Sequence, residues 1–466
     1  MRPTVVINVV GLSARHLGPH TPRIQAFANK GRRAFVRPSF PAVTCTAQSD
    51  FLTGVSPSVH GIVGNGWYHR ELAETQFWKQ PDMLVQAPKV WDRLRRRDAG
   101  FTCAKTFWWY NMYSEVEYSV TPRPMYPADG RKVFDIYSWP YSLGHKLKGE
   151  LGAFPFPTFW GPAAGEQSPA GPPDAVSRWI AEAAKWIDSE HNPTLQLVYL
   201  PHLDYNLQRF GVSDGRIETD LRAIDQIVGD LIDFFEARER RVLLVSEYGI
   251  TDVHRPVHLN RLFRERGWLV VKEELGRELI DFGASDAFAV ADHQVAHVYV
   301  RRPTLRERVA ETLRDQAGVG RVIVEEQDKF AAGIAHPRAG DIVVESTADS
   351  WFTYYYWMDD RRAPDFARCV DIHRKPGYDP VELFVDPELR LPKAHIAWRL
   401  LRKKLGFRML MDVIPLDASL VRGSHGRIPE SETDWPMLIG DSSCAIDSDR
   451  LSAQDVRDVI ENTVCP

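Results

Sequence analysis

Short apolar runs alternate with segments of helical periodicity along the first 260 residues. Four runs are short and apolar enough to be strands buried on both faces: Val5–Val10, Phe101–Trp109, Leu195–Leu200 and Arg241–Val245. Four segments place apolar residues three and four positions apart, as helices do: Thr21–Lys30, Lys89–Arg97, Val176–Ile187 and Ile217–Ala237. This alternation predicts an α/β protein with a mostly parallel central sheet and helices on both faces.

Two parts of the chain do not follow this alternation: a long stretch after the second predicted strand, and the C-terminal tail. Between Met112 and Pro172 the chain is rich in Pro and aromatic residues and has no regular period. We expect this stretch to fold over the end of the sheet as a long functional loop. The tail after Ile439 shows the least organisation.

From Leu262 onward the order of the elements becomes that of an α+β unit. We therefore expect an inserted α+β cap over residues 262–361, and a core formed by residues 1–261 and 362–466. One strand is expected over Phe288–Val300.

That expected strand carries His293 and His297, four positions apart and so on one face. Two histidines on one face can bind a metal, but without a carboxylate known to be near them a structural or surface role is the favoured interpretation.

Composition narrows the classes of function. The 466-residue chain has a net charge of −4, so its average charge gives no footprint for a nucleic-acid polymer or an anionic membrane. No apolar stretch is long enough for a membrane span, and the first residues do not read as a secretion signal. The five cysteines are scattered and include no CxxC pair, which indicates free thiols in a reducing compartment. We expect a cytoplasmic protein, and the sequence leaves its oligomeric state open.

The clearest candidate chemistry lies in residues 40–65. Pro41 interrupts regular structure, and the residues from Thr46 onward suit an amphipathic helical turn that Gly54 ends. A Thr at the start of a helix lies beside unpaired backbone N–H groups and the positive end of the helix dipole. Thr44 or Thr46 can therefore act as a nucleophile on a phosphoryl group, clamp a phosphate, or simply cap the helix.

Polar residues also follow several of the predicted strands. Thr44, Asp204 and the pair Glu247 and Tyr248 come at or shortly after strand ends. Ligands bind at the carboxyl ends of strands in open α/β sheets, so we expect these side chains to meet there. His425 lies in a Gly-rich turn, where a site role and a solvent-exposed role have equal weight.

The order of these features resembles the alkaline phosphatase superfamily. It consists of a strand ending in Gly, a Thr turn, a strand followed by Asp, a strand followed by Ser-x-x-Gly, and a Gly-x-His-Gly turn. The resemblance is closest to the nucleotide pyrophosphatase/phosphodiesterase branch and the related phosphonoacetate hydrolases. Its most specific residues are Phe40-Pro41, Thr44, Leu52-Thr53-Gly54, His60-Gly61-Ile62 and Asn65. It implies an alkaline phosphatase-like fold, Thr44 as the nucleophile and Asn65 as the catalytic donor to a phosphate oxygen.

The same resemblance implies two divalent metal ions, zinc or manganese, which activate the nucleophile and a water molecule. One family site takes an Asp, a His four residues later and the His of the Gly-x-His-Gly turn. In this chain those positions hold Asp204, Gln208 and His425. Gln208 is a poor zinc ligand compared with imidazole.

The other family site takes an Asp before the first strand's Gly, the Thr, and an Asp-His pair. This chain has Val10, Thr44, Glu247 and Tyr248 at those positions. Valine cannot bind a metal, Glu247 can, and Tyr248 can do so only as a phenolate or can contact the substrate instead. The departures predict either a reorganised site, in which oxygen ligands favour manganese or magnesium, or a site without turnover.

Three hypotheses of function follow. The first is a metal-dependent hydrolase of a phosphodiester, pyrophosphate or phosphonate, with Thr44 as nucleophile and a small phosphorylated molecule as substrate. The second is a degenerate member of the same fold that binds a phosphorylated or other anionic ligand without turnover. The third is another enzyme activity on a hydrophobic substrate, for which the aromatic residues between Phe107 and Trp160 are the support.

Overall fold

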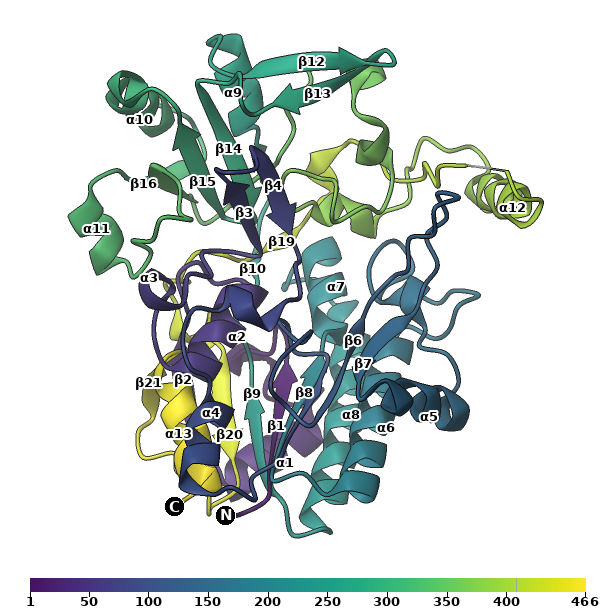
Figure 1. Ribbon diagram of the computed structural model, residues 1–466, viewed down its shortest axis with the longest axis vertical. Coiled ribbons are helices and arrows are strands. Elements are labelled where there is room, and N and C mark those ends of the chain that lie inside the picture. The colour runs from purple at the N-terminus through teal and green to yellow at the C-terminus, as the bar shows by residue number, and fades with distance from the viewer. Residues whose placement is uncertain (408) are drawn as a thin grey trace.

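The computed structural model describes residues 1–407 and 409–466 and contains a nine-stranded central sheet (Figure 1). The strand order is β21-β2-β20-β9-β1-β8-β5-β6-β7, and pairing is parallel except between β2 and β20, β20 and β9, and β6 and β7. The strands are β1 (Thr4–Val9), β2 (Arg32–Arg37), β5 (Cys103–Thr106), β6 (Tyr118–Pro122), β7 (Ile136–Trp139), β8 (Leu195–Leu200), β9 (Arg241–Val245), β20 (Met437–Gly440) and β21 (Arg450–Ser452). Every residue of β1 and β8 is buried, as expected for central parallel strands covered on both faces.

Helices cover both faces of this sheet (Figure 1). One layer contains α1 (Pro22–Lys30), α5 (Tyr141–Leu151), α6 (Ala175–His191) and α8 (Ile217–Glu236), and the other α2 (Thr44–Thr53), α4 (Val90–Arg97) and α13 (Asp455–Val464). This arrangement confirms the predicted α/β class with a mostly parallel sheet. It corrects the interpretation of the tail, because α13 buries Val456, Val459 and Ile460 and packs against α2 and α4.

The aromatic stretch between Met112 and Pro172 is not an irregular loop. It contains β6, β7 and α5, and β6 extends the central sheet by pairing in parallel with β5. Strands of four and five residues are too short to show a period in the sequence, and their backbone groups are satisfied by pairing of β6 with β5 and of β7 with β6.

A second, four-stranded sheet has its own hydrophobic cluster and lies beyond the carboxyl edge of the first (Figure 1). It consists of β14 (Ala287–Asp292), β15 (Val295–Val300), β17 (Ile342–Ser346) and β16 (Val319–Ile323), with α9 (Leu259–Glu265), α10 (Arg306–Arg314) and α11 (Glu326–Ala331) nearby. The limits of a cap over residues 262–361 stay a prediction.

The single strand expected over Phe288–Val300 is wrong. The chain reverses at His293 and Gln294 to form the hairpin of β14 and β15, with His293 at a φ of 61°. Apolar residues flank the turn on both sides, so the sequence pattern runs through it without interruption. His293 and His297 therefore do not share one strand face.

The remaining α-helices and strands lie outside the two larger sheets. They are α3 (Pro57–His60), β3 (Gly66–His69) with β4 (Glu74–Phe77), α7 (His202–Phe210), β10 (Thr251–Asp252) with β19 (Gly423–Ser424), β11 (Arg255–Val257) with β18 (Ser350–Phe352), β12 (Val270–Glu274) with β13 (Arg277–Asp281), and α12 (Pro392–Lys404).

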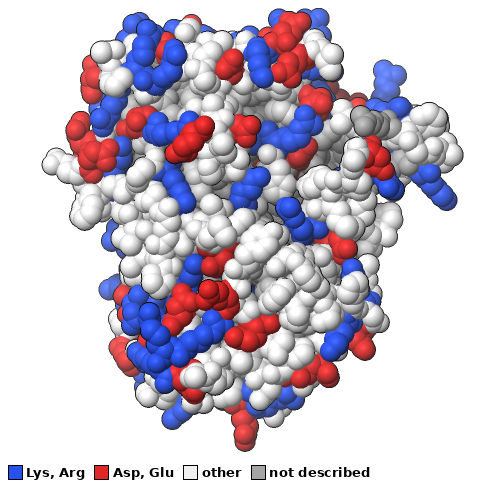
Figure 2. Space-filling view, in the orientation of Figure 1, with Lys and Arg blue, Asp and Glu red and all other residues white. Residues whose placement is uncertain are grey.

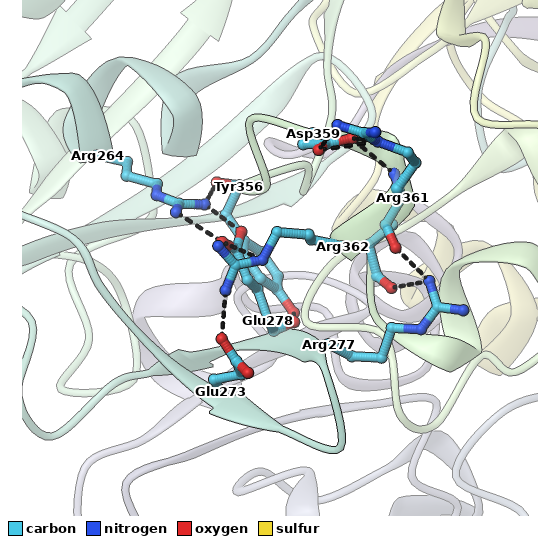
Figure 3. A network of polar contacts seen from close by, with 9 residues as sticks. Arg264, Glu273, Arg277, Glu278, Tyr356, Asp359, Arg361 and Arg362 are labelled. Carbon is cyan, nitrogen blue, oxygen red and sulfur yellow. Dashed lines mark hydrogen bonds and ion pairs between the residues drawn. The ribbon is translucent and has the colours of Figure 1, made fainter.

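A network of Arg and Glu residues joins the β12–β13 hairpin to α9 and to the segment that leaves the second sheet (Figure 3). Glu278 is nearly fully buried and accepts from Arg264 at 2.9 Å, while Arg362 lies 3.3 Å from the same carboxylate. Arg277 donates to the backbone oxygen of Arg361 at 2.6 Å. Two guanidinium groups lower the pKa of Glu278, mainly through the hydrogen bond from Arg264, so the carboxylate stays charged and holds the hairpin in place.

Candidate active site

Four candidate residues lie together where the strands of the central sheet end. Thr44 is the first residue of α2, Asp204 lies in the first turn of α7 after β8, Tyr248 follows β9, and His425 follows β19. Each is less than a tenth exposed. Helix α2 begins at Thr44 rather than Thr46, so Thr44 is the threonine at the helix start.

A chain of hydrogen bonds starts at Thr44. The Tyr248 hydroxyl donates to Asp204 Oδ1 at 3.1 Å, and its oxygen lies 3.2 Å from Thr44 Oγ1. Because the one hydroxyl hydrogen of Tyr248 points to the carboxylate, the Thr44 hydroxyl is the donor in the other bond. Asp204 Oδ2 accepts from the Gln208 amide at 2.8 Å, and the Tyr378 hydroxyl donates to Gln208 Oε1 at 3.1 Å. One tyrosine thus connects the candidate nucleophile to a buried carboxylate.

Four aromatic rings form a continuous stack beside this chain. Tyr248 stacks on His425 with ring centroids 3.6 Å apart, His425 lies against His293 at 3.7 Å, and His293 stacks on Tyr378 at 3.6 Å. Tyr248 follows β9 and His425 lies in the Gly-x-His-Gly turn. His293 lies in the β14–β15 turn, and Tyr378 lies in the segment after the second sheet. The stack therefore holds both sheets against the site.

The two imidazoles in the stack have the same tautomer. His425 Nδ1 donates to the backbone oxygen of Ala42 at 2.7 Å, and His293 Nδ1 donates to Asp292 Oδ1 at 2.8 Å. The Nε2 atoms, which therefore carry lone pairs, have no hydrogen-bond partner among the described residues. Burial lowers the pKa of both histidines and keeps them neutral. A neutral imidazole whose Nδ1–H is held by a carboxylate or carbonyl has the arrangement found in metal-bound histidines.

Glu247 forms a separate pair of contacts at the base of the site. Its Oε1 accepts from Asn8 at 2.6 Å and from Gln48 at 2.5 Å, and Gln48 Oε1 in turn accepts from the Trp109 backbone at 2.7 Å. Burial raises the pKa of Glu247 to about 8, and the hydrogen bonds from Gln48 and Asn8 oppose that rise. Two amides thus occupy Oε1, whereas Oε2 has no hydrogen-bond partner among the described residues.

Asn65 links the start of α2 to the second sheet. Its Oδ1 accepts from the Cys45 backbone N–H at 3.0 Å, and its Nδ2 donates to Asp292 Oδ1 at 3.1 Å. The Asn65 backbone N–H also donates to Asp292 Oδ2 at 2.7 Å. Asn65 therefore contacts Cys45, the residue that follows Thr44, and its side-chain amide already has two protein partners.

The electrostatic balance of the site is negative. Burial raises the pKa of Asp204 to about 7 and that of Asp292 to about 6, in addition to the rise at Glu247. None of the ion pairs in the described part of the chain joins a Lys or Arg to these three carboxyl groups; the two that reach them come from histidines. Because no Lys or Arg among the described residues offsets their burial, these carboxyl groups hold their protons to a higher pH than exposed ones do.

The segment that carries Tyr378 is fixed by a buried ion cluster. Lys375 Nζ lies 2.7 Å from Asp379 and 2.8 Å from Glu382, and all three side chains are no more than 2% exposed. Glu382 also accepts from the Trp160 indole at 2.6 Å. Fully satisfied buried clusters of this kind set one geometry, here that of the turn that places Tyr378 on the stack.

Several residues of the site were not identified from sequence. Asp292, Gln48 and Tyr378 carry no motif, and their roles arise from contacts made in space. The sequence indicates His293 as a possible metal ligand, but the single strand expected there places it on one face with His297. His297 instead contacts the Val63 oxygen at 2.8 Å and accepts from the Gly340 N–H, which is a structural role.

The residues at the family's metal positions fit the implied ions only in part. Val10 is fully buried and aliphatic, the Tyr248 hydroxyl lies between Thr44 and Asp204, and Glu247 is held by amides. No three His, Cys, Asp or Glu side chains among the described residues converge as metal ligands do. The two-metal arrangement therefore does not fit. The buried polar atoms of the site without a hydrogen-bond partner among the described residues include Nε2 of His293, Nε2 of His425 and Oε2 of Glu247, and Asp204 Oδ1 lies 3.9 Å from Nε2 of His425.

Comparison with known proteins places these features in context. Residues 4–379 match the family described as type I phosphodiesterase / nucleotide pyrophosphatase. A curated protein of Schizosaccharomyces pombe, named an uncharacterized pyrophosphatase/phosphodiesterase, is 21% identical over 267 residues. The match covers 56% of this chain and 47% of that protein, so the chain matches about half the length of this relative.

Two solved structures have a similar fold over their whole length. Phosphonoacetate hydrolase from Sinorhizobium meliloti, in complex with phosphonoformate, has a TM-score of 0.61 at 12% identity, covering 100% of this chain and 96% of that one. Murine ectonucleotide pyrophosphatase/phosphodiesterase 5, an inactive variant in complex with AMP, has a TM-score of 0.58 at 12% identity, covering 100% and 95%. At this identity the likeness shows the fold, which is that of the alkaline phosphatase superfamily.

Proposed function

The chain belongs to the type I phosphodiesterase / nucleotide pyrophosphatase family, and on that premise we propose that it hydrolyses a small phosphodiester or pyrophosphate through Thr44. The observation that carries the proposal is the hydrogen-bonded chain from Thr44 through Tyr248 to Asp204. It provides a nucleophile at a helix start and a route for its proton. A phosphonate ester of similar shape is an alternative substrate.

The proposed reaction uses residues of this chain at each proton transfer. Thr44 Oγ1 attacks phosphorus, and the bond from phosphorus to the leaving oxygen breaks with its electron pair. The Thr44 proton passes to the Tyr248 oxygen while the Tyr248 proton passes to Asp204, and the leaving oxygen takes a proton from water. A second water then attacks the phosphorus of the Thr44 ester and gives a proton to the hydroxide left by the first water. The bond from phosphorus to Thr44 Oγ1 breaks with its electron pair, and Asp204 returns its proton through Tyr248 to restore the Thr44 hydroxyl.

We further propose that one divalent cation binds the Nε2 atoms of His293 and His425, with Asp204 beside it. Two ligands on a tetrahedral zinc lie roughly 3.3 Å apart, given bonds of about 2.0–2.1 Å, so Asp204 Oδ1 at 3.9 Å from His425 is slightly too far to share it. The two imidazole donors suit zinc, and the other positions are left for water and phosphoryl oxygens, which manganese also accepts. When bound, the cation would neutralise charge on the phosphoryl group.

Turnover is tested with bis-p-nitrophenyl phosphate and added manganese or zinc. Hydrolysis that Thr44→Ala abolishes, in a variant that stays folded and loses only about 1 kcal/mol of stability with the hydrogen bond to Tyr248, is the expected result. Absence of turnover with any divalent ion would contradict the hydrolase. Binding of AMP or a phosphonate without turnover would instead favour the degenerate binding protein, which Val10 and the amide-capped Glu247 support.

The cation is tested by metal content rather than by activity. After equilibration with manganese and removal of free ion, His293→Gln is expected to lose most of the bound metal. His373→Gln is the matched control, because His373 is partly buried and contacts the Phe77 backbone instead. Equal metal content in the wild type and both variants would place any cation elsewhere.

A further inference from the structure

The most unusual surface of the molecule is helix α12 with the residues that follow it. Twenty-one large apolar side chains are exposed among the described residues, and seven of them lie between positions 391 and 410. These seven are Leu391, Trp398, Leu400, Leu401, Leu405, Phe407 and Leu410. A concentration of this kind marks a surface that is covered in use. In Figure 1 the helix projects from the side of the second sheet, away from the central one.

One side of α12 is fixed to the body of the protein. Arg399 donates to Asp412 at 2.7 Å, His395 contacts the same carboxylate at 3.2 Å, and Ile396 packs against the second hydrophobic cluster. With about 100° between successive residues, Trp398, Leu401 and Leu405 share a face that points away from this attachment. They are 57%, 46% and 62% exposed. The apolar face is thus held outward by contacts on the opposite side.

Basic residues flank that apolar face. Arg402 lies about 70° to one side of its centre, and Lys393 and Lys404 about 90–110° to the other. Figure 2 shows basic side chains at the edges of this projection with uncharged ones between them. Between positions 392 and 411 the sequence has six Lys or Arg and no Asp or Glu, although the whole chain has a net charge of −4. The local charge is therefore opposite to the average.

We propose that α12 is an interfacial anchor that binds the surface of an anionic lipid bilayer. An outward apolar face with Trp and Leu, bordered by Lys and Arg, is the pattern of helices that lie in the plane of the interface. At about 1.5 Å per residue its 13 residues extend roughly 20 Å, which is shorter than a hydrocarbon core of about 30 Å. None of the described helices is long and apolar enough to cross a membrane, so the proposed contact is with one leaflet.

Charge favours a lipid surface over a second copy of the chain. A twofold interface across this face would bring the basic border of one copy (Lys393, Arg402 and Lys404) close to that of the other, with no acidic residue between positions 392 and 411 to pair with either. Anionic headgroups supply the opposite charge along the whole border. This proposal is independent of the proposed turnover at Thr44.

The experiment is flotation of the full chain with vesicles of phosphatidylcholine alone, or of phosphatidylcholine with phosphatidylglycerol. We expect binding to the anionic vesicles that weakens as salt is added, and at least about tenfold weaker binding by the double variant Trp398→Ser, Leu405→Ser. The matched control is Leu275→Ser, Phe330→Ser, which removes two side chains that are 103% and 75% exposed elsewhere on the molecule. It is expected to bind as the wild type does.

Three outcomes would overturn the proposal. They are no binding to anionic vesicles, equal loss in both double variants, and a wild-type dimer in the absence of lipid that only Trp398→Ser, Leu405→Ser dissociates. The last result, measured by sedimentation, would assign α12 to an interface between copies. Unchanged far-ultraviolet circular dichroism and melting temperature establish that each variant is folded, because the exchanged side chains are exposed.

Discussion

The hydroxyl of Tyr248 offers the sharpest test of the site. In Tyr248→Phe the ring and its stack on His425 are retained, and only the oxygen between Thr44 and Asp204 is removed. If the proton of Thr44 leaves through this oxygen, the variant loses the route while keeping the nucleophile. The change in the free energy of unfolding and the change in kcat are then expected to differ in size.

The magnitudes follow from the contacts. The hydroxyl makes two hydrogen bonds between buried groups, each with a net contribution of about 1 kcal/mol, so we expect a loss of about 1–3 kcal/mol in the free energy of unfolding. Loss of a positioned proton acceptor typically lowers kcat by about 10²–10⁴-fold, or roughly 3–5 kcal/mol in the activation free energy. The catalytic loss is therefore expected to exceed the loss of stability.

Tyr378→Phe is a matched control. Tyr378 is also buried, its ring also stacks on a histidine at 3.6 Å, and its hydroxyl also donates to a side chain of α7. Its hydroxyl does not contact Thr44, so kcat is expected to fall less than about tenfold, with a loss of stability of about 1 kcal/mol. Steady-state hydrolysis of bis-p-nitrophenyl phosphate and thermal unfolding of both variants give the comparison. Equal losses of kcat in the two variants, or full activity in Tyr248→Phe, would refute the proton route.

Three further predictions concern the buried cluster beside Tyr378, the glycine after Tyr248 and His16, a buried histidine in the turn after β1. Lys375→Met leaves two buried carboxylates without their cation, so we expect a loss of about 3–5 kcal/mol in thermal or urea unfolding; an unchanged melting temperature would contradict the role of the cluster. Gly249→Ala would place a Cβ 1.6 Å from the backbone oxygen of Asp434, so we expect a loss of at least about 3 kcal/mol or no soluble protein, and a stable variant would contradict this packing. Burial lowers the pKa of His16 from 6.5 to about 4, so the folded state binds fewer protons than the unfolded state between these values and the wild type loses up to about 3 kcal/mol as pH falls from 6.5 to 4. His16→Gln is expected to lose less stability between pH 6.5 and pH 4. If the free energy of unfolding of wild type and variant fell equally with pH, His16 would not be the group responsible.

The central strands could be predicted from sequence because their period and burial are local properties. The predicted strands over Leu195–Leu200 and Arg241–Val245 coincide with β8 and β9, and the helix with Pro22 at its first position begins there. The β14–β15 turn could not be predicted, because apolar residues flank it and only the antiparallel pairing of β14 with β15 distinguishes two strands from one. Strands β6 and β7 could not be predicted either, because at five and four residues they are too short to show a period.

The sequence by itself determined the α/β class, the threonine at a helix start, and the departures at Val10 and Gln208 from the family's ligands. Those features depend on the identity of single residues, on the order of motifs along the chain and on hydrophobic periods of a few residues. Only the tertiary structure decided that the Tyr248 hydroxyl lies between Thr44 and Asp204, and that His293 joins the stack from the second sheet. The reason is that hydrogen-bond and stacking geometry depends on distances between segments far apart in the chain, which no local pattern encodes.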